Sequence, residues 1–198
     1  MLDMPASYRV RPNVRFDNPT LSNSPYARAM KFLPLVIVAV WVGLDQALKA
    51  WTVVNIPCCY QWDRAVHVLP GLSLVHATNI GAAWNLFSGA TPVLIALRLI
   101  AGIGILVWVM RTAKMPRLQT IAFSLIAAGA LGNSIDGLTR GFVVDMLWSH
   151  WLSAVYIPIF QGEFPIFNIA DTGVFCGAAL LFISSLLNPV KAKAPTAV

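Results

Sequence analysis

Four long apolar stretches constrain the fold of this chain more than any other feature of its 198 residues. Each holds roughly 20 consecutive, mostly apolar residues, the length that an α-helix needs to cross the hydrocarbon core of a bilayer. They lie at 34–54, 91–110, 118–136 and 166–187. The composition agrees, because 58% of the residues are hydrophobic and only 11% are charged, against about 45–50% and about 25% in soluble domains. The sequence therefore predicts an all-α integral membrane protein, a bundle of four transmembrane helices.

The basic residues predict how the chain crosses the membrane. Ten of the 14 lysines and arginines fall in three clusters: five in 1–31, three in 111–117 and two in 191–193. Four spans place all three clusters on one side, which the positive-inside rule identifies as the cytoplasm. The segment 142–160 is long enough to be a fifth span, but a fifth span would put the last cluster outside. We therefore expect four spans with both termini cytoplasmic, and we attribute the net charge of +6 to this topology rather than to nucleic-acid binding.

The segments outside the spans differ in kind. Residues 1–30 are rich in Pro, Asn, Ser and Arg and lack the apolar core of a secretory signal, so we expect a disordered cytoplasmic tail. The membrane domain then occupies 31–190, and a short cytoplasmic tail occupies 191–198. Between the first two spans, "GLSLVHATN" is typical of a short strand or hairpin flanked by turn residues. The three histidines show no metal-ligand spacing, and the three cysteines form no disulfide framework. No metal or cofactor is therefore expected.

Polar residues that are costly inside a membrane converge on one depth in this topology. The first and third spans run outward and the fourth runs inward, so the polar positions near their outer ends meet at the outer leaflet. These positions are Asp45 and Lys49 in the first span, Asn133 and Asp136 in the third, Asn168 and Asp171 in the fourth, and Asp145 in an external segment. Ionisable residues at such depths indicate function by default.

Structural roles account for part of this set. Asp45 and Lys49 are four residues apart on a helix and are expected to pair with each other. The glycines, including Gly173 and Gly177 in a GxxxG spacing, are expected to serve helix packing. Neither the ion pair nor the glycines therefore indicate catalysis or ligand binding.

Asp145 and Asp171 are the strongest candidates for catalytic residues. Few cations are placed to neutralise them in a purely structural salt bridge, namely Lys49, Arg98 and Arg140. Two carboxylates brought together share one proton, because like charges at close range cannot both ionise. The ionised one can take a proton from water while the neutral one donates to a scissile carbonyl, which favours peptide hydrolysis. The alternative from another class is a small membrane transporter whose buried aspartates relay protons.

Four blocks of the sequence resemble, in order, the motifs of the lipoprotein signal peptidase (signal peptidase II) family, which are aspartic proteases of the bacterial inner membrane. The blocks are "DQALK" (45–49), "NIGAAWNLF" (79–87), "GNSIDGLTRGFVVDML" (132–147) and "FNIADT" (167–172). With the spans between them, the resemblance covers 33–188. It implies four transmembrane helices, a small periplasmic β-rich cradle, an active site at the periplasmic side of the membrane, and no cofactor.

The resemblance also implies roles for individual residues. Asp145 and Asp171 match the catalytic dyad of the family. The positions that match residues supporting the site or the substrate are Asp45, Lys49, Asn79, Gly81, Asn133, Asp136 and Asn168. The substrate would be a prolipoprotein, cut immediately before its diacylglyceryl-modified cysteine, whose lipid chains keep it at the bilayer surface. The implied partners are lipid-modified prolipoproteins and membrane lipid, without nucleic acid.

The chain departs from the family pattern at two positions. It has Gly137 where an arginine usually follows the aspartate, and Trp84 where the family has phenylalanine. Arg140, three residues after Gly137, is the expected replacement for the missing arginine. We expect the change at Gly137 to affect how the substrate is held rather than the dyad itself.

Overall fold

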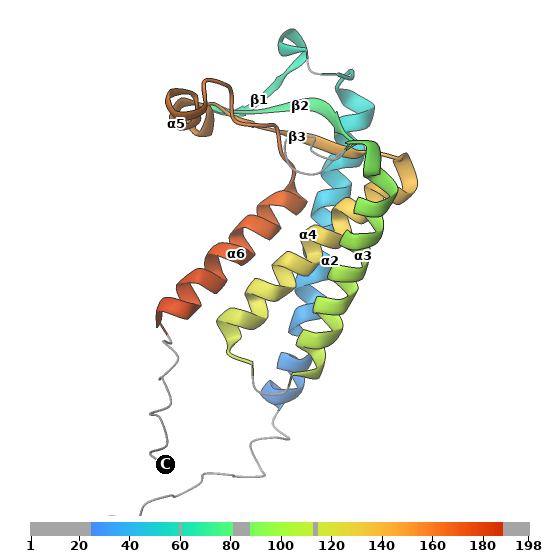
Figure 1. Ribbon diagram of the computed structural model, residues 1–198, viewed down its shortest axis with the longest axis vertical. Coiled ribbons are helices and arrows are strands. Elements are labelled where there is room, and N and C mark those ends of the chain that lie inside the picture. Colours follow the sequence, from blue (N-terminus) through green and yellow to red (C-terminus); the bar gives the residue numbers. More distant parts are fainter. Residues whose placement is uncertain (1–24, 60, 81–87, 113–114, 188–198) are drawn as a thin grey trace, which may run out of the picture. The chain divides into compact units, whose positions relative to one another are not determined.

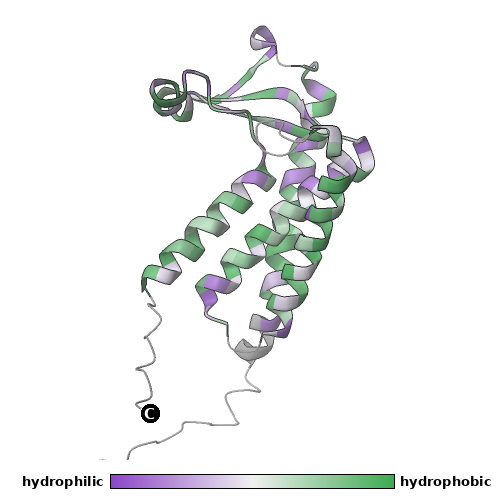
Figure 2. Ribbon diagram, in the orientation of Figure 1, coloured by the Kyte–Doolittle hydropathy of each residue, from purple (hydrophilic) through white to green (hydrophobic). Residues whose placement is uncertain are grey.

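The structure, a computed structural model, describes residues 25–59, 61–80, 88–112 and 115–187. Four of its helices are long and apolar enough to cross a membrane: α2 (Pro25–Asn55), α3 (Thr91–Arg111), α4 (Arg117–Arg140) and α6 (Ile169–Leu187). Figure 1 shows these helices extending from one side of a small sheet. Figure 2 shows that they are mostly hydrophobic, with hydrophilic residues concentrated at helix ends and in the segments near the sheet. The predicted fold class is confirmed.

Helix α4 is the centre of the bundle. Of its most apolar stretch 61% is buried, against 11–22% in the other three helices, which therefore expose most of their apolar surface to the membrane. It packs against α3 on one side and α6 on the other. Glycines make the contact with α6 close: a Cβ on Gly129 would collide with the carbonyl oxygen of Ala170, and one on Gly177 would lie 2.5 Å from that of Ala122. The packing role predicted for the glycines is confirmed.

A three-stranded antiparallel sheet lies at one end of these helices, which we call the sheet end (Figure 1). Its strands, in spatial order, are β1 (Val66–Leu69), β2 (Leu72–Asn79) and β3 (Val143–Ser149), accompanied by the short 3-10 helices η1 (Trp62–Arg64) and η3 (Ser88–Ala90). The β1–β2 hairpin confirms the prediction from "GLSLVHATN". On β3, the buried residues Val144 and Met146 pack with Leu74 and with Ile56 near the end of α2. This small core fixes β3 against the helices.

The segment 142–160 is not a fifth span. Strand β3 occupies its first half, and α5 (His150–Phe160) occupies the second. A helix of 11 residues is too short to cross a bilayer. Gly141 ends α4 in the left-handed conformation that favours glycine, with φ at 79°, and directs the chain from α4 into β3. The expectation of four spans is confirmed, and Asp145 lies on a strand rather than in a membrane helix.

Two features differ from the sequence prediction. Helix α2 begins at Pro25, so residues 25–30 are helical, whereas the sequence predicts a disordered tail up to residue 30. Cys58 and Cys59 are joined by a disulfide, whereas no disulfide framework is expected from the sequence. Residues 1–24 and 188–198, which include the expected C-terminal tail, lie outside the described residues. The chain separates into two units, 1–31 and 32–198, and the sheet and α3 to α6 belong to the second.

Candidate active site

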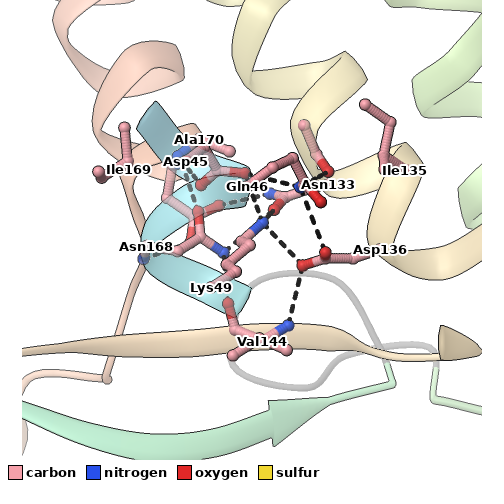
Figure 3. A network of polar contacts seen from close by, with 12 residues as sticks. Asp45, Gln46, Lys49, Asn133, Ile135, Asp136, Val144, Asn168, Ile169 and Ala170 are labelled. Carbon is pink, nitrogen blue, oxygen red and sulfur yellow. Dashed lines mark hydrogen bonds and ion pairs between the residues drawn. The ribbon is translucent and has the colours of Figure 1, made fainter. Parts of the chain in front are cut away.

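A network of buried charges connects α2, α4 and the start of α6 (Figure 3). The Lys49 ammonium lies 2.8 Å from Asp45 Oδ2 and 2.8 Å from Asp136 Oδ2, and all three side chains are fully buried. Arg140 forms a second ion pair with Asp136 from one turn further along α4. Gln46 donates to both carboxylates, at 3.1 Å and 3.3 Å. Two cations thus balance two carboxylates, as the burial of charge requires, and the predicted Asp45–Lys49 pair is confirmed.

This network holds the two chain segments that carry the candidate dyad. Asp136 Oδ2 accepts a hydrogen bond at 3.1 Å from the backbone N–H of Val144, the residue before Asp145. Asp45 Oδ1 accepts one at 2.9 Å from the backbone N–H of the residue before Asp171. Each supporting carboxylate therefore fixes the backbone next to one candidate catalytic carboxylate.

Two asparagines connect the network to the dyad itself. Asn133 Oδ1 accepts from Lys49 Nζ at 2.9 Å and from Asn168 Nδ2 at 3.0 Å, and Asn133 Nδ2 donates to Asp171 Oδ1 at 2.8 Å. Asn168 Nδ2 also donates to Asp145 Oδ1 at 2.6 Å. A continuous chain of hydrogen bonds therefore runs from the buried ammonium to both carboxylates, and neighbouring bonds in such a chain polarise one another.

Asp171 is held by the start of its own helix. Asn168, directly before α6, accepts a hydrogen bond at 2.8 Å from the Asp171 N–H, and Asp171 Oδ2 accepts one at 3.2 Å from the Asn168 N–H. This reciprocal pair is a capping box, in which the N-cap residue and the third helical residue satisfy each other's backbone N–H. The carboxylate therefore lies at a helix N-terminus, where the helix dipole favours negative charge. The motif "FNIAD" sets this geometry locally.

Asp145 is buried on β3, with only 5% of its surface exposed. Besides the bond from Asn168, its Oδ2 accepts one at 3.3 Å from Asn79 Nδ2, at the end of the neighbouring strand. Burial, and then the nearby charge of Asp171, raise the pKa of Asp145 from 3.8 to about 7, against the opposing effect of the two asparagine hydrogen bonds. The Asp145 carboxyl is therefore partly protonated near neutral pH.

Asp145 and Asp171 line one cavity of about 770 Å³. Its walls are mostly apolar and come from α3, α4, β3, the segment before α6 and α6 itself. Asn79 and Asn133 also line it, and Arg98 is the only basic side chain among the described residues that do. A bound molecule can therefore contact both carboxylates while most of its surface lies against apolar side chains.

This arrangement is suited to the activation of water. Burial and the nearby charge of Asp171 oppose the ionisation of Asp145, and two neighbouring carboxyls can share one proton. A water molecule bound there can lose a proton to the anion while the neutral carboxyl protonates a carbonyl oxygen. Within the described ranges, no group of three or more His, Cys, Asp or Glu side chains is arranged to hold a metal ion.

The predicted site residues that the structure describes belong to one connected network. They are Asp45, Lys49, Asn79, Asn133, Asp136, Arg140, Asp145, Asn168 and Asp171. Gly81 and Trp84 lie outside the described residues. At Gly137, Ile95 of α3 occupies the space of a side chain, with its Cδ1 2.7 Å from where a Cβ would lie. Where the family usually has an arginine, Gly137 therefore leaves room for Ile95 of α3. Arg140 forms the ion pair with Asp136.

The sequence analysis missed the roles that the structure gives to two residues of the site. Gln46 donates to Asp45, Asp136 and the carbonyl oxygen of Gly132. The sequence indicates such a role for Gln46 only in that it is a polar residue next to Asp45 inside an apolar span. Arg98 is predicted only as a possible salt-bridge partner, whereas the structure places it in the wall of the cavity.

Comparison with known proteins gives a consistent result. The family model described as signal peptidase (SPase) II matches residues 37–187. A lipoprotein signal peptidase from Deinococcus radiodurans is 45% identical over 157 residues, which are 79% of this chain and 80% of the relative. One from Lactococcus lactis subsp. lactis is 38% identical and covers 80% of this chain and 96% of the relative. A solved structure described as a bacterial membrane enzyme has a TM-score of 0.67 at 29% identity, over 84% of this chain and 94% of that one.

Proposed function

The chain belongs to the signal peptidase II family of membrane proteases, and we propose that Asp145 and Asp171 are the catalytic dyad with which it cuts prolipoproteins before a diacylglyceryl-modified cysteine. One observation carries this proposal: Asn168 donates to Asp145 and shares a capping box with Asp171, and both carboxylates line one cavity. The transporter alternative has no support, because the matched relatives are named as peptidases.

In the proposed reaction, Asp145 carries the shared proton and Asp171 carries the negative charge at the N-terminus of α6. Asp171 takes a proton from a water molecule, whose oxygen attacks the carbonyl carbon before the modified cysteine. Asp145 gives its proton to the carbonyl oxygen, which forms a gem-diol. When the C–N bond breaks, Asp171 returns a proton to the departing nitrogen and Asp145 takes one from the diol. The products are a signal peptide with a new carboxyl end and a lipoprotein with a free amino group on its lipidated cysteine.

The other residues that match the family motifs would position this pair rather than react. Lys49 balances the two supporting carboxylates, Asp45 and Asp136, whose second role is to fix the backbone beside the dyad. Asn79 lines the cavity and donates to Asp145, which supports a role at the substrate. The role expected for Gly81 stays a prediction.

The proposal includes an orientation in the membrane. The three basic clusters favour cytoplasmic termini, which would place the sheet end at the outer leaflet of the bacterial inner membrane. A lipid-modified cysteine stays at that surface, because its acyl chains remain in the bilayer. The substrate and the carboxylates would then meet at the same depth.

Cleavage of a defined substrate by the purified protein tests this function. With a synthetic peptide that carries a diacylglyceryl cysteine, the protein should release a fragment that begins at the lipidated cysteine, which mass spectrometry identifies. The same peptide without lipid is the control and should remain uncut. Cleavage at another bond, or equal cleavage of the unlipidated peptide, would contradict the proposal.

A further inference from the structure

Arg98 is a charged residue inside a membrane-spanning helix. It lies seven residues after Thr91, about 10 Å along α3 from the end of the helix nearest the sheet. Ile100, two residues further on, faces outward with 69% of its surface exposed, whereas Arg98 is partly buried and lines the cavity of the dyad. A charge at such a depth is unfavourable unless it faces a polar group or a cavity, and its usual meaning is functional.

The direction of the Arg98 side chain follows from the direction of α3. Side chains tilt toward the N-terminus of their helix, and α3 begins at the sheet end (Figure 1). A long arginine side chain therefore extends toward the depth of the two carboxylates while its methylene groups stay in the apolar layer. The Arg98 guanidinium is therefore expected on the sheet side of the deeper part of the cavity.

That deeper part of the cavity is apolar. It is lined by Ala101, Ile105, Ile126, Gly129, Ala130 and Ala178. Ile105 lies seven residues beyond Arg98 on α3, and Ala178 lies seven beyond Asp171 on α6, which is about 10 Å in each case. Small side chains leave space there over α4. Along the helices, the lining of the cavity therefore changes from two carboxylates and one arginine to an apolar trough.

A diacylglyceryl cysteine presents the complementary groups in the same order. Its scissile peptide carbonyl is followed, after a short chain of covalent bonds, by two ester carbonyls and then by two acyl chains. A guanidinium offers five N–H donors in a rigid plane and no acceptor, so it binds carbonyl oxygens well. On the basis of the function proposed above, we propose that Arg98 donates hydrogen bonds to the ester carbonyl oxygens of the substrate and that the apolar trough holds an acyl chain. Arg98 is then a positioning residue that selects acyl esters without touching the reacting atoms.

Two substrates that differ only at the esters test this role. One is a lipopeptide with a diacylglyceryl cysteine, and the other has ether-linked alkyl chains of equal length, which lack the carbonyl oxygens. The wild-type protein should prefer the diester by roughly 10- to 100-fold in kcat/KM, as expected for hydrogen bonds to a charged donor. The preference should appear mainly in KM, since these bonds are present in both the ground state and the transition state. Arg98→Leu should cleave both substrates about as well as the wild type cleaves the diether.

Two further variants separate this role from a structural one. Arg111→Leu makes the same change on the same helix, outside the residues that line the cavity, and should leave the preference for the diester intact. Arg98→Lys should keep part of it, and it provides a readout if Arg98→Leu does not fold. Equal cleavage of the two substrates by the wild type, or an equal loss on both in Arg98→Leu, would overturn the inference. If the wild type cleaves neither, the proposed function itself fails.

Discussion

At the scale of single residues, the two halves of one amide side chain organise the site. Asn168 Oδ1 completes the capping box with Asp171, and its Nδ2 donates to Asp145 and Asn133. A side-chain amide supplies two N–H donors and one acceptor oxygen at a fixed separation. The same residue therefore starts helix α6 and sets where the two carboxylates stand.

The first prediction concerns the dyad. Asp145→Asn and Asp171→Asn should each lower the rate of prolipoprotein cleavage by roughly 10²–10⁴-fold, because neither half of a pair that shares a proton can act alone. Asparagine has nearly the same shape as aspartate, so both variants should insert and stay folded. The matched control is Asp63→Asn, which changes an exposed carboxylate on η1 and should leave the rate unchanged. Substantial cleavage by either dyad variant would refute the assignment.

The second prediction concerns pH and rests on Asp145, whose pKa is raised from 3.8 to about 7. The folded protein keeps this proton up to about pH 7, whereas the unfolded chain loses it near 3.8, so the contribution of Asp145 to stability falls as pH rises between those values. Asp145→Asn removes this titration. The melting temperature of the variant, relative to the wild type, should therefore rise between about pH 4 and pH 7 and level off above.

Cleavage by the wild type gives a second readout of the same titration. Its rate should decline as pH rises through about 7, because the dyad then loses the shared proton. A difference in melting temperature that stays constant from pH 5 to pH 8 would show that Asp145 does not titrate in this range.

At the scale of elements, helix α4 combines packing with the support of the site. Its glycines bring α6 close, and its Asp136 holds the strand that carries Asp145. The start of α6, with Asp171, lies directly against Gly129 through Ala170. A change in the packing of α4 against α6 therefore moves one carboxylate relative to the other.

The third prediction tests this coupling. In Gly129→Ala, the new methyl group would collide with the backbone of Ala170, so α6 must shift, at a cost of about 1–3 kcal/mol. Both the melting temperature and the cleavage rate should fall. The matched control is Gly104→Ala on α3, where nothing lies within 4 Å of the new Cβ. It should be neutral or stabilising by up to about 1 kcal/mol, as alanine favours helix over glycine. Equal effects of the two changes would exclude the packing argument.

The fourth prediction concerns Arg140, which links the end of α4 to the buried charges. Arg140→Ala would leave Asp45 and Asp136 to share Lys49 as their one ion-pair partner among the described residues. We expect a loss of about 1–3 kcal/mol of stability and roughly a tenfold or larger fall in turnover, because the strand held by Asp136 shifts.

Arg64→Ala is the control for Arg140→Ala. It removes an exposed arginine whose pair with Asp63 spans 3.5 Å at the surface, where such pairs contribute little. It should change neither the melting temperature nor kcat, and Arg140→Lys should restore part of the loss. Wild-type turnover in Arg140→Ala would remove Arg140 from the support of the site.

At the scale of the whole molecule, hydropathy and charge divide the functions of the chain. The membrane helices are apolar along most of their length, and the polar network lies at the sheet end (Figure 2). The basic residues Arg111 and Arg117 lie where α3 ends and α4 begins, away from the sheet. A polar site at one end of apolar helices suits a protease whose substrate is anchored in one leaflet, because site and substrate then lie at the same depth.

The fifth prediction is the topology. Alkaline phosphatase fused after residue 163, in the segment between α5 and α6, should be active, because the sheet end is expected outside the cytoplasm. The same enzyme fused after residue 114, between α3 and α4, should be inactive. The opposite pattern would invert the orientation, and activity at both positions would contradict the four-span arrangement.

The four spans and most members of the site can be predicted from the sequence alone. Apolar stretches of fixed length set the four spans, and the basic clusters give their expected direction, because both properties depend on the chain locally. The convergence of Asp45, Asp136, Asp145 and Asp171 at one depth follows from residue order along those spans. The capping box of "FNIAD" is equally local, since its two residues are three apart.

Which of these side chains contact one another follows from the tertiary structure and not from the sequence. Residue order gives the depth of a side chain but not the rotation of its helix, which depends on how glycines and bulky residues pack across each interface. That packing places Lys49 between two carboxylates and Arg98 in the wall of the cavity. It also places Ile95 of α3 in the space beside Gly137, which no local pattern in the sequence records.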